Sequence, residues 1–263
     1  MSSTADLSLP SSERVAAQPR ERKRVFYPTM AIAMAVIVLI GFGPSFYFRA
    51  LTARAVHLPS AIVWIHGLVF TSWVLVLLLQ TTLVWIGKIQ WHRRVGIAGV
   101  ALAALMVVLG ATVQILQARR DVAAGFMPIE DVDENLLLIG ALFMMAIYGG
   151  LIGAAVGFRS RPEFHKRFIL LGTVVLLGAA TSRIAAMCVR AIPSLWSRAP
   201  LIDTALNDVF ILVLAIHDLR TRGRLHPATV WGAIPILLMQ GLSFTSFYDS
   251  DSATAFTTWI GNL

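Results

Sequence analysis

Seven long apolar segments, separated by short polar or basic stretches, constrain this chain more than any other feature of its sequence. An α-helix needs about 20 residues to cross the roughly 30 Å of hydrocarbon in a bilayer, and each segment is close to that length. Only 14% of the residues are charged, against about 25% in soluble domains. We therefore predict an all-α fold, a polytopic membrane helix bundle of about seven transmembrane helices. The predicted helices cover residues 27–48, 59–86, 95–116, 136–158, 168–189, 201–219 and 228–247.

Prolines, glycines and acidic residues mark where these helices should deviate. Gly43 and Pro44 predict that the first helix kinks or ends there, and Pro235 predicts a kink in the last one. The segment 201–219 is the weakest of the seven because acidic residues crowd its first turns. We predict three regions: a disordered cytoplasmic tail (1–25), the helix bundle (26–248) and a short outer-face tail (249–263) with an aromatic anchor at the membrane surface.

The basic residues predict the orientation of the bundle, because cytoplasmic loops of membrane proteins carry an excess of lysine and arginine. With the N-terminus inside, fifteen of the 22 lysine and arginine residues fall in the tail and the inner loops. Every inner loop is then basic. We therefore predict a multi-pass protein with a cytoplasmic N-terminus and a periplasmic C-terminus. The remaining basic residues are Arg49, Arg54, Arg119, Arg120, Arg183, Arg190 and Arg198.

Two basic stretches, which open the third and the fifth predicted helices, resemble each other. His92 and His165 are each followed by two basic residues, and a glycine follows each histidine by seven residues, at Gly99 and Gly172. The match predicts that the second and third helices and the fourth and fifth helices are parallel repeats, related by a pseudo-twofold axis along the membrane normal. The alternative is that a basic cap at the membrane surface simply recurs.

A stripe of small residues lies on the fourth predicted helix, at Gly149, Gly153 and Gly157. Four-residue spacing puts the three glycines on one face, where another helix can approach closely. The stripe is either a contact between two copies in a homo-oligomer or a packing surface within the bundle, and we favour the second.

Polar side chains at membrane depth are costly, so they are candidate site residues. At 100° per residue they form one stripe on each of four helices, and we expect these stripes to face the bundle interior. The outer polar cluster consists of His66, Gln114, Arg183, Asn207 and Asp208. Arg183 and Asp208 are the natural ion pair there, unless Arg183 extends to the outer membrane surface instead. The inner polar cluster consists of Gln80, His217, Asp218 and His226, with His92 and His165 in the same layer.

The inner histidines suggest a cofactor. Two neutral imidazoles that face each other across a helix bundle can ligate a haem iron axially. The predicted repeat places His92 and His165 at the same depth on related helices, so they are candidate ligands of one haem b. The basic residues that follow them, Arg93, Arg94, Lys166 and Arg167, could neutralise the haem propionates. The alternative is that both histidines are caps at the lipid headgroups.

Other classes of site are not predicted. The net charge of +8 would suggest nucleic-acid binding in a soluble protein, but here the basic residues are topology signals, so we expect no nucleic-acid partner. Cys188 is the only cysteine, which excludes an intrachain disulfide and a cysteine-based metal site. The sequence has no HExxH, GxSxG, P-loop or CxxCH motif. We predict no metal site.

The polar residues carry a resemblance. The chain resembles a family of uncharacterised bacterial multi-pass membrane proteins, and its histidine layout is similar in style to cytochrome b561-type haem bundles, without their second histidine pair. The resemblance implies a bacterial inner membrane and supplies no established activity. It rests on His66-Gly67, Gln80, His92-Arg93 with Gly96, His165-Lys166-Arg167-Phe168 and Arg183.

Three functions stay open. The first is an integral inner-membrane carrier or an accessory or assembly subunit, with membrane lipids as its partners. The second is a haem-binding or quinone-linked redox protein that uses the inner-side histidines. The third is an enzyme that acts on a lipid-borne substrate. Base rates favour the first, whereas the second makes the sharpest chemical prediction.

Reporter fusions test the predicted orientation. A reporter at Ser160 should report a cytoplasmic position, and one at Leu263 a periplasmic position, because the basic loops stay inside. A cytoplasmic C-terminus would contradict the prediction and would mean that the segment 201–219 does not cross.

Overall fold

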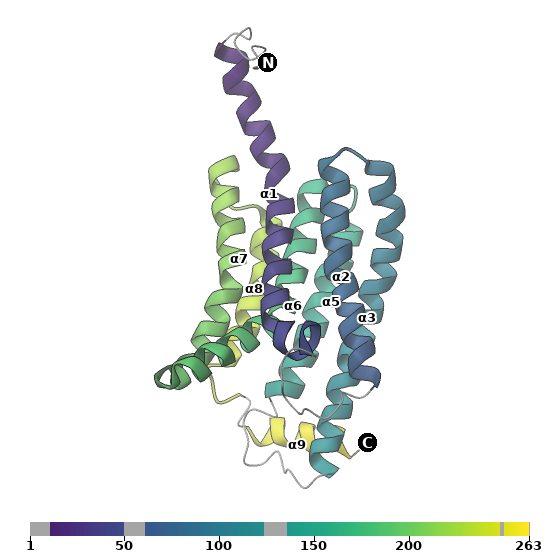
Figure 1. Cartoon of the computed structure of the whole chain (residues 1–263), viewed down its shortest axis with the longest axis vertical. Helices are drawn as coiled ribbons and strands as arrows, with labels where there is room; N and C mark the ends of the chain where they lie inside the picture. The colour runs from purple at the N-terminus through teal and green to yellow at the C-terminus, as the bar shows by residue number, and fades with distance from the viewer. Residues whose placement is uncertain (1–10, 50–60, 124–135, 248–249, 263) are drawn as a thin grey trace.

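The computed structural model describes residues 11–49, 61–123, 136–247 and 250–262, with side chains except at 11–24, 121–123 and 136–137. The regular structure of these residues is entirely helical, without a strand, which confirms the all-α prediction (Figure 1). The helices are α1 (Ser11–Phe42), η1 (Gly43–Tyr47), α2 (Ala61–Trp85), α3 (Ile89–Ala123), η3 (Leu136–Gly140), α5 (Ala141–Gly157), α6 (Pro162–Ala191), η4 (Pro193–Arg198), α7 (Ala199–Arg222), α8 (Pro227–Leu242) and α9 (Asp251–Gly261).

Six helical segments of the described chain are long and apolar enough to cross a membrane, and a seventh, α8, is apolar but shorter. The protein is thus a polytopic helical bundle. Helix α7 has 24 residues, so the segment predicted to be the weakest forms a full-length helix. The short helix is instead α8, whose 16 residues extend over about 24 Å at 1.5 Å per residue. Pro235 lies inside α8 without ending it.

Helix α1 begins earlier than predicted and ends where the sequence predicted a kink or an end. It begins at Ser11, inside the segment that was expected to be a disordered tail, of which residues 1–10 lie outside the described chain. It ends at Phe42, where the backbone widens into the π-helical turn η1 with Pro44 in its first positions. This change occurs where Gly43 and Pro44 predicted a kink or an end, because proline cannot donate a helical hydrogen bond.

Five helices, α1, α2, α3, α5 and α6, form a ring. Helix α3 packs against α2 and α5, and α5 packs against α6. Helix α1 closes the ring by packing against both α6 and α2. Inside the ring, the Trp73 indole on α2 donates to the Thr173 hydroxyl on α6 at 3.3 Å and meets the Tyr148 ring of α5 edge-on, with 5.5 Å between ring centroids. Helices α3 and α6 are not adjacent but lie diagonally across the ring, with α5 between them.

Helix α6 is the centre of the molecule. Besides α5, it packs against α1, α7 and α8, and most of its side chains from Arg167 to Leu177 are buried. The contact with α1 is the closest. A Cβ atom on Gly41 would lie 2.5 Å from the carbonyl oxygen and 2.8 Å from the Cα atom of Ala180.

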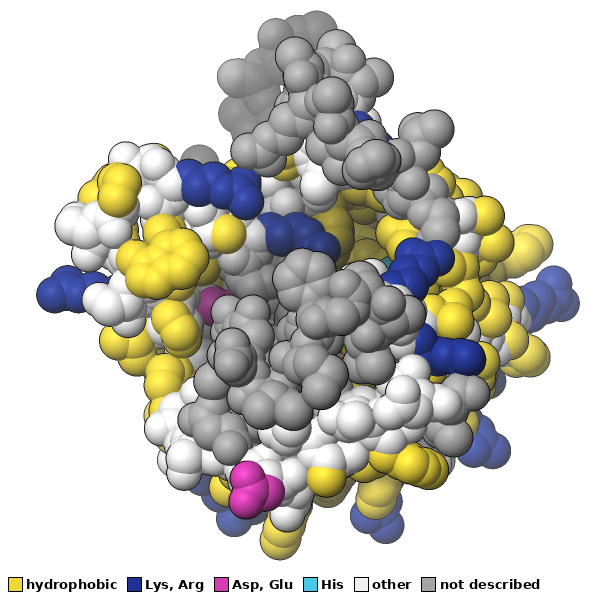
Figure 2. All heavy atoms as spheres, turned by 90° about the horizontal axis from the view of Figure 1, so that it is seen from below, with side chains coloured by type: hydrophobic (Ala, Val, Ile, Leu, Met, Phe, Trp, Pro, Cys, Tyr) yellow, Lys and Arg dark blue, Asp and Glu magenta, His cyan; other side chains and the backbone are white. Residues whose placement is uncertain are grey.

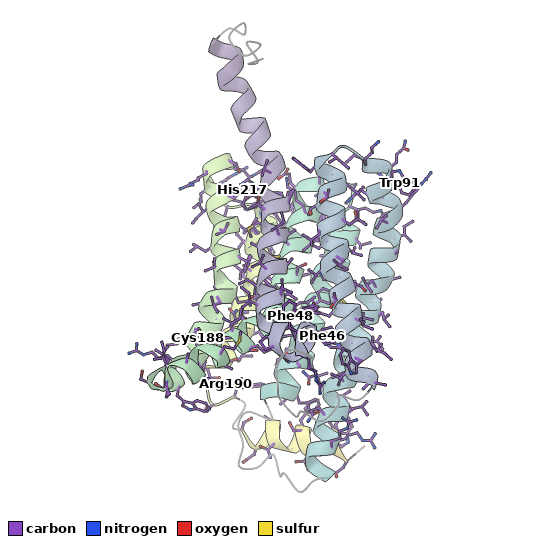
Figure 3. The ribbon with its side chains drawn as sticks, in the orientation of Figure 1. Phe46, Phe48, Trp91, Cys188, Arg190 and His217 are labelled. Carbon is purple, nitrogen blue, oxygen red and sulfur yellow. The ribbon has the colours of Figure 1, made fainter. Side chains whose placement is uncertain are left out.

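The two ends of the bundle differ. The turns between α2 and α3, α5 and α6, and α7 and α8 all lie at one end, which we call the basic end because Lys88, Arg159 and Arg222 lie there (Figure 1). Both predicted repeat hairpins therefore turn at the same end. Trp91 and His217 lie toward the basic end, whereas Cys188 and Arg190 lie toward the opposite one (Figure 3).

Helix α9 lies across the end opposite the basic end (Figure 1). The Ser250 hydroxyl caps it by accepting a hydrogen bond from the Ala253 backbone N–H at 3.3 Å. Ile260 packs on α3 and η3, whereas Phe256 and Trp259 are exposed. The residues expected to form a short tail with an aromatic anchor are therefore an amphipathic helix. From this end, apolar side chains cover much of the rim of the bundle, with lysine and arginine side chains between them (Figure 2).

Replacing Gly41 by alanine should destabilise the protein by about 1–3 kcal/mol, because the new methyl group meets the backbone of α6, which cannot yield locally. Thermal unfolding in detergent measures the loss. Gly150→Ala is the matched control, since nothing lies within 4 Å of its Cβ position. Equal melting temperatures for the two variants would contradict the close α1–α6 contact.

Candidate functional site

The inner histidines meet at the basic end of the five-helix ring. His92 lies in the first turn of α3 and His165 in the first turn of α6, and both are half-buried. Their ring centroids are 6.2 Å apart and their planes are at 88°. Because α3 and α6 are diagonal across the ring, the two imidazoles face one another across its interior. They do not point to opposite sides of the bundle, an arrangement that would have excluded a shared ligand.

The hydrogen bond of His165 fixes which of its nitrogens is available. Its Nδ1 lies 2.8 Å from the carbonyl oxygen of Ala155 on α5. A carbonyl can only accept, so Nδ1 carries the hydrogen, and in the neutral ring Nε2 keeps its lone pair. Ligating histidines characteristically use this arrangement, in which the second ring nitrogen donates to a carbonyl or a carboxylate.

Unpaired polar atoms surround His92. Its Nδ1 is buried without a hydrogen-bond partner, and so are both Nε2 and Oε1 of Gln80 on α2. The Gln80 Nε2 lies 3.7 Å from the position that a Cβ atom on Gly96 would take. Gly96 is one helical turn after His92 on α3. A buried polar group without a partner costs about 1–3 kcal/mol. Two such atoms on Gln80 and one on His92 make this a place where a ligand or a water can complete hydrogen bonds.

A second polar group at the basic end joins α6 to α7 and α8. Arg167 and Asp218 have exposed fractions of only 1% and 0%. Arg167 donates from Nε to Asp218 Oδ1 at 3.1 Å and also from Nη2 to the same oxygen. Its Nη1 donates to the carbonyl oxygen of Glu163 at 2.9 Å and to its carboxylate at 2.5 Å. The buried charges are thus fully paired, which a buried ion pair requires.

Asp218 also holds the start of α8. Its Oδ2 accepts from the His226 backbone N–H at 3.1 Å and from the Thr229 hydroxyl at 2.5 Å. The His226 Nδ1 accepts from the Ala228 N–H at 3.1 Å and so caps α8. Burial, together with the positive charges of Arg167 and Arg222, lowers the pKa of His226, which keeps that nitrogen unprotonated and able to accept. His226 and Asp218 therefore serve the structure.

His217, the remaining inner residue, faces α1. Its ring stacks on Phe26 with centroids 3.7 Å apart and planes at 13°. Next to it, the Lys166 ammonium lies 2.7 Å from Glu163 Oε1 and 4.7 Å from the centroid of the Tyr27 ring. The predicted inner polar cluster is therefore divided. Gln80 accompanies the inner histidines, whereas His217, Asp218 and His226 tie α1, α7 and α8 to α6.

This division changes the expected role of the basic residues. Arg167, considered for haem propionates, is committed to Asp218 and faces away from His165, because two residues turn a helix by about 200°. Lys166 pairs with Glu163. Arg93 and Arg94 are exposed beside His92, and the Arg94 guanidinium lies 5.5 Å from the Trp91 ring.

The outer polar cluster does not come together as predicted. Arg183 and Asp208 are not among the ion pairs formed by the described residues. The Arg183 guanidinium lies 4.3 Å from the Phe42 ring of α1 and donates to the carbonyl oxygen of Ala179. The predicted pair is wrong because α7 turns Asp208 toward Gln240 of α8, away from α1. Arg183 does lie within electrostatic range of His66 on α2.

The other outer residues lie apart. Asn207 is buried, and its Oδ1 has no partner within the described chain. One turn before it, Asp203 accepts from the Thr181 hydroxyl of α6 at 2.5 Å. Gln114 is half-buried on α3, and no hydrogen bond joins it to the other four predicted members of the cluster.

The glycine stripe of α5 changes its surroundings along the helix. A Cβ atom on Gly149 would lie 3.3 Å from Val107 of α3, so this glycine packs within the bundle. Gly153 and Gly157 are exposed and have nothing within 4 Å of their Cβ positions. Whether they contact another copy stays a prediction.

Sequence reasoning missed several residues that organise the site. It did not single out Glu163 and Thr229 as site residues, and it considered Arg167 for the haem propionates instead of as the partner of Asp218. The available signal was Asp218, an acidic residue on an apolar helix face, which requires a buried cationic partner. The carbonyl of Ala155 carries no sequence signal, because every residue has one.

Comparison of the chain with protein-family models, with curated proteins and with solved structures finds no match. The resemblance to an uncharacterised bacterial membrane family and to cytochrome b561-type bundles therefore stays a prediction that rests on the residues quoted for it.

Asp218→Ala should lower the unfolding free energy by about 3–5 kcal/mol, because it leaves Arg167 buried without its counter-charge. Glu163→Gln should cost far less, since the Glu163 side chain is 47% exposed and exposed pairs contribute up to about 1 kcal/mol. Unfolding in detergent at increasing denaturant concentration measures the unfolding free energy of both variants. Replacing the pair together, as R167M/D218L, should recover much of the loss. A small effect of Asp218→Ala would show that the pair is not structural.

Proposed function

We propose that this protein is a haem-binding membrane redox protein, in which His92 and His165 ligate the iron of one haem b at the basic end of the bundle. The observation that carries the proposal is the 6.2 Å separation of the two imidazole rings across the interior of the five-helix ring. When bound, such a haem supplies one-electron transfer.

The separation fits two axial ligands. Fe–N bonds of about 2 Å, with each ring centre about 1 Å beyond its nitrogen, would put the ring centres about 6 Å apart. The His165 Nδ1 donates to the carbonyl oxygen of Ala155. That hydrogen bond leaves the lone pair of Nε2 as the ligating position, as in other histidine-ligated metals.

Two further observations support a ligand at this place. The buried Nδ1 of His92 and the side-chain amide of Gln80 have no hydrogen-bond partner within the described chain, so the place can accept a ligand. The exposed Arg93 and Arg94 lie at the same end and can pair with carboxylate groups that reach the surface. A solute carrier or an assembly subunit, the other functions considered, gives no reason for two imidazoles from diagonal helices to face each other.

The proposal includes an orientation in a bacterial inner membrane. The basic end would face the cytoplasm, where Lys88, Arg93 and Arg159 can contact anionic lipid headgroups. Helix α9 would then lie on the periplasmic surface, with Phe256 and Trp259 directed toward the lipid interface. Membrane lipids are the partners that these exposed side chains suit, and nothing in the bundle calls for nucleic acid.

An absorption spectrum of the purified protein tests the proposal. The reduced protein should show a Soret band and a sharp α-band typical of low-spin haem, with about one haem per chain. His92→Ala and His165→Ala should each abolish that low-spin spectrum while the protein still inserts, because insertion depends on the apolar helices.

His66→Ala is the matched control, since His66 lies on α2 away from the inner pair, and it should keep the spectrum of the parent. Absence of haem from the parent after expression with added haem precursor would overturn the proposal. So would a spectrum that both inner-histidine variants retain.

A further inference from the structure

We propose that α7 and α8 hold a monovalent cation between them, coordinated by Asn207 Oδ1, Asp208 Oδ1 and Gln240 Oε1. The proposal does not depend on the haem. Asn207 and Asp208 lie in the first half of α7 and Gln240 in the last turn of α8, so all three lie toward the end of the bundle opposite the inner histidines. An amide-rich site of this kind has no sequence motif, and none was predicted.

The three oxygens are buried acceptors, and each lacks a hydrogen-bond partner within the described chain. Asn207 and Gln240 have exposed fractions of only 4% and 9%. Asp208 interacts with the side chain of Gln240, so the two helices bring these polar groups together. Oxygens that only accept cannot pair with one another. They can share a cation, because hard cations take oxygen ligands.

The register of α7 and α8 puts Asn207 opposite Gln240. The two helices are antiparallel, and near their turn Asp218 of α7 accepts from Thr229 of α8. Asn207 lies eleven residues before Asp218, and Gln240 lies eleven residues after Thr229. Eleven residues make three turns and about 20°, so each residue shares a face with its counterpart, about 16.5 Å further along the helix. Asn207 and Gln240 therefore form a second polar level of the same helix pair.

The two levels differ in positive charge. At the basic end, Arg167 of α6 supplies the cation that Asp218 requires. At the outer level, Asp208 takes part in none of the ion pairs found among the described residues. Arg183 of α6 lies instead against the Phe42 ring of α1. A bound cation would supply at the outer level what Arg167 supplies at the basic end.

The ligands favour a monovalent ion, and sodium is the ion with which we test the site. Sodium takes carbonyl and carboxylate oxygens in membrane proteins, and the three oxygens belong to one carboxylate and two neutral amides. The neighbouring carboxylate, Asp203, accepts from the Thr181 hydroxyl of α6 at 2.5 Å. No group of three or more histidine, cysteine, aspartate or glutamate residues that could hold a metal ion occurs in the part of the chain that the structure describes. The site therefore lacks the carboxylates with which a calcium ion is usually bound.

Binding of radioactive sodium to the purified full-length protein tests the proposal. The parent should bind about one sodium ion per chain, and sodium chloride should raise its melting temperature above that in choline chloride of equal ionic strength, because an ion that binds only the folded state stabilises it. Asp208→Asn keeps the shape of the side chain and removes its charge, so it should weaken sodium binding about tenfold or more. Gln240→Leu removes the oxygen that α8 contributes and should also weaken binding.

Asp251→Asn is the matched control, because it makes the same change at an exposed carboxylate on α9, at the same end of the bundle, and should leave sodium binding unchanged. A parent that binds no sodium and melts equally in both salts would overturn the proposal, since a water or a proton would then satisfy the oxygens. Unchanged binding in either Asp208→Asn or Gln240→Leu would overturn it as well. If Gln240→Leu fails to fold, Asp208→Asn decides alone. His92→Ala, which lacks a proposed haem ligand, should still bind sodium, so failure of the haem proposal leaves this test intact.

Discussion

The enclosure of α6 by its neighbours is the constraint on which the rest of the structure depends. Helices α1, α5, α7 and α8 all pack on it, so the polar groups that it buries must find partners inside the protein. Two of these polar residues, two positions apart in the sequence, lie on different faces of the helix. His165 turns toward α3 and α5, and Arg167 turns toward α7 and α8. A single turn of helix thereby serves a candidate ligand site on one side and a structural ion pair on the other.

The two polar groups at the basic end differ in whether their buried atoms have hydrogen-bond partners. Arg167 and Asp218 satisfy each other and their neighbours, so their hydrogen bonds contribute to stability without leaving a group free for chemistry. Around His92 the opposite holds, because buried atoms of His92 and Gln80 lack partners. Proteins tolerate such a cost chiefly where a ligand or a water completes the hydrogen bonds. The contrast separates the part of the basic end that holds the bundle together from the part that can bind.

Prediction from sequence succeeded and failed for identifiable reasons. The apolar segments predicted the helices, and the similarity of the two histidine stretches predicted that His92 and His165 lie at the same end. The helical wheel correctly put Asp218 on an inward face but could not say which helix it would meet, so Arg167 was considered for the haem propionates and not as the partner of Asp218. The Arg183–Asp208 pair failed for the same reason. The sequence of one helix predicts the depth and the face of a residue, but the packing of the helices decides which residue lies next to it. Asp208 lies next to Gln240 of α8 and not next to Arg183.

The sequence by itself determined that this chain is a multi-pass helical membrane protein, because apolar runs of about 20 residues have no other way to pair their backbone groups in lipid. It also determined which end of the bundle is basic. Only the tertiary structure decided that α3 and α6 lie on a diagonal with their histidines facing inward, and that Asp218 belongs to Arg167. Side-chain partners across helices depend on the order of the helices around the bundle, and hydropathy carries no information about that order.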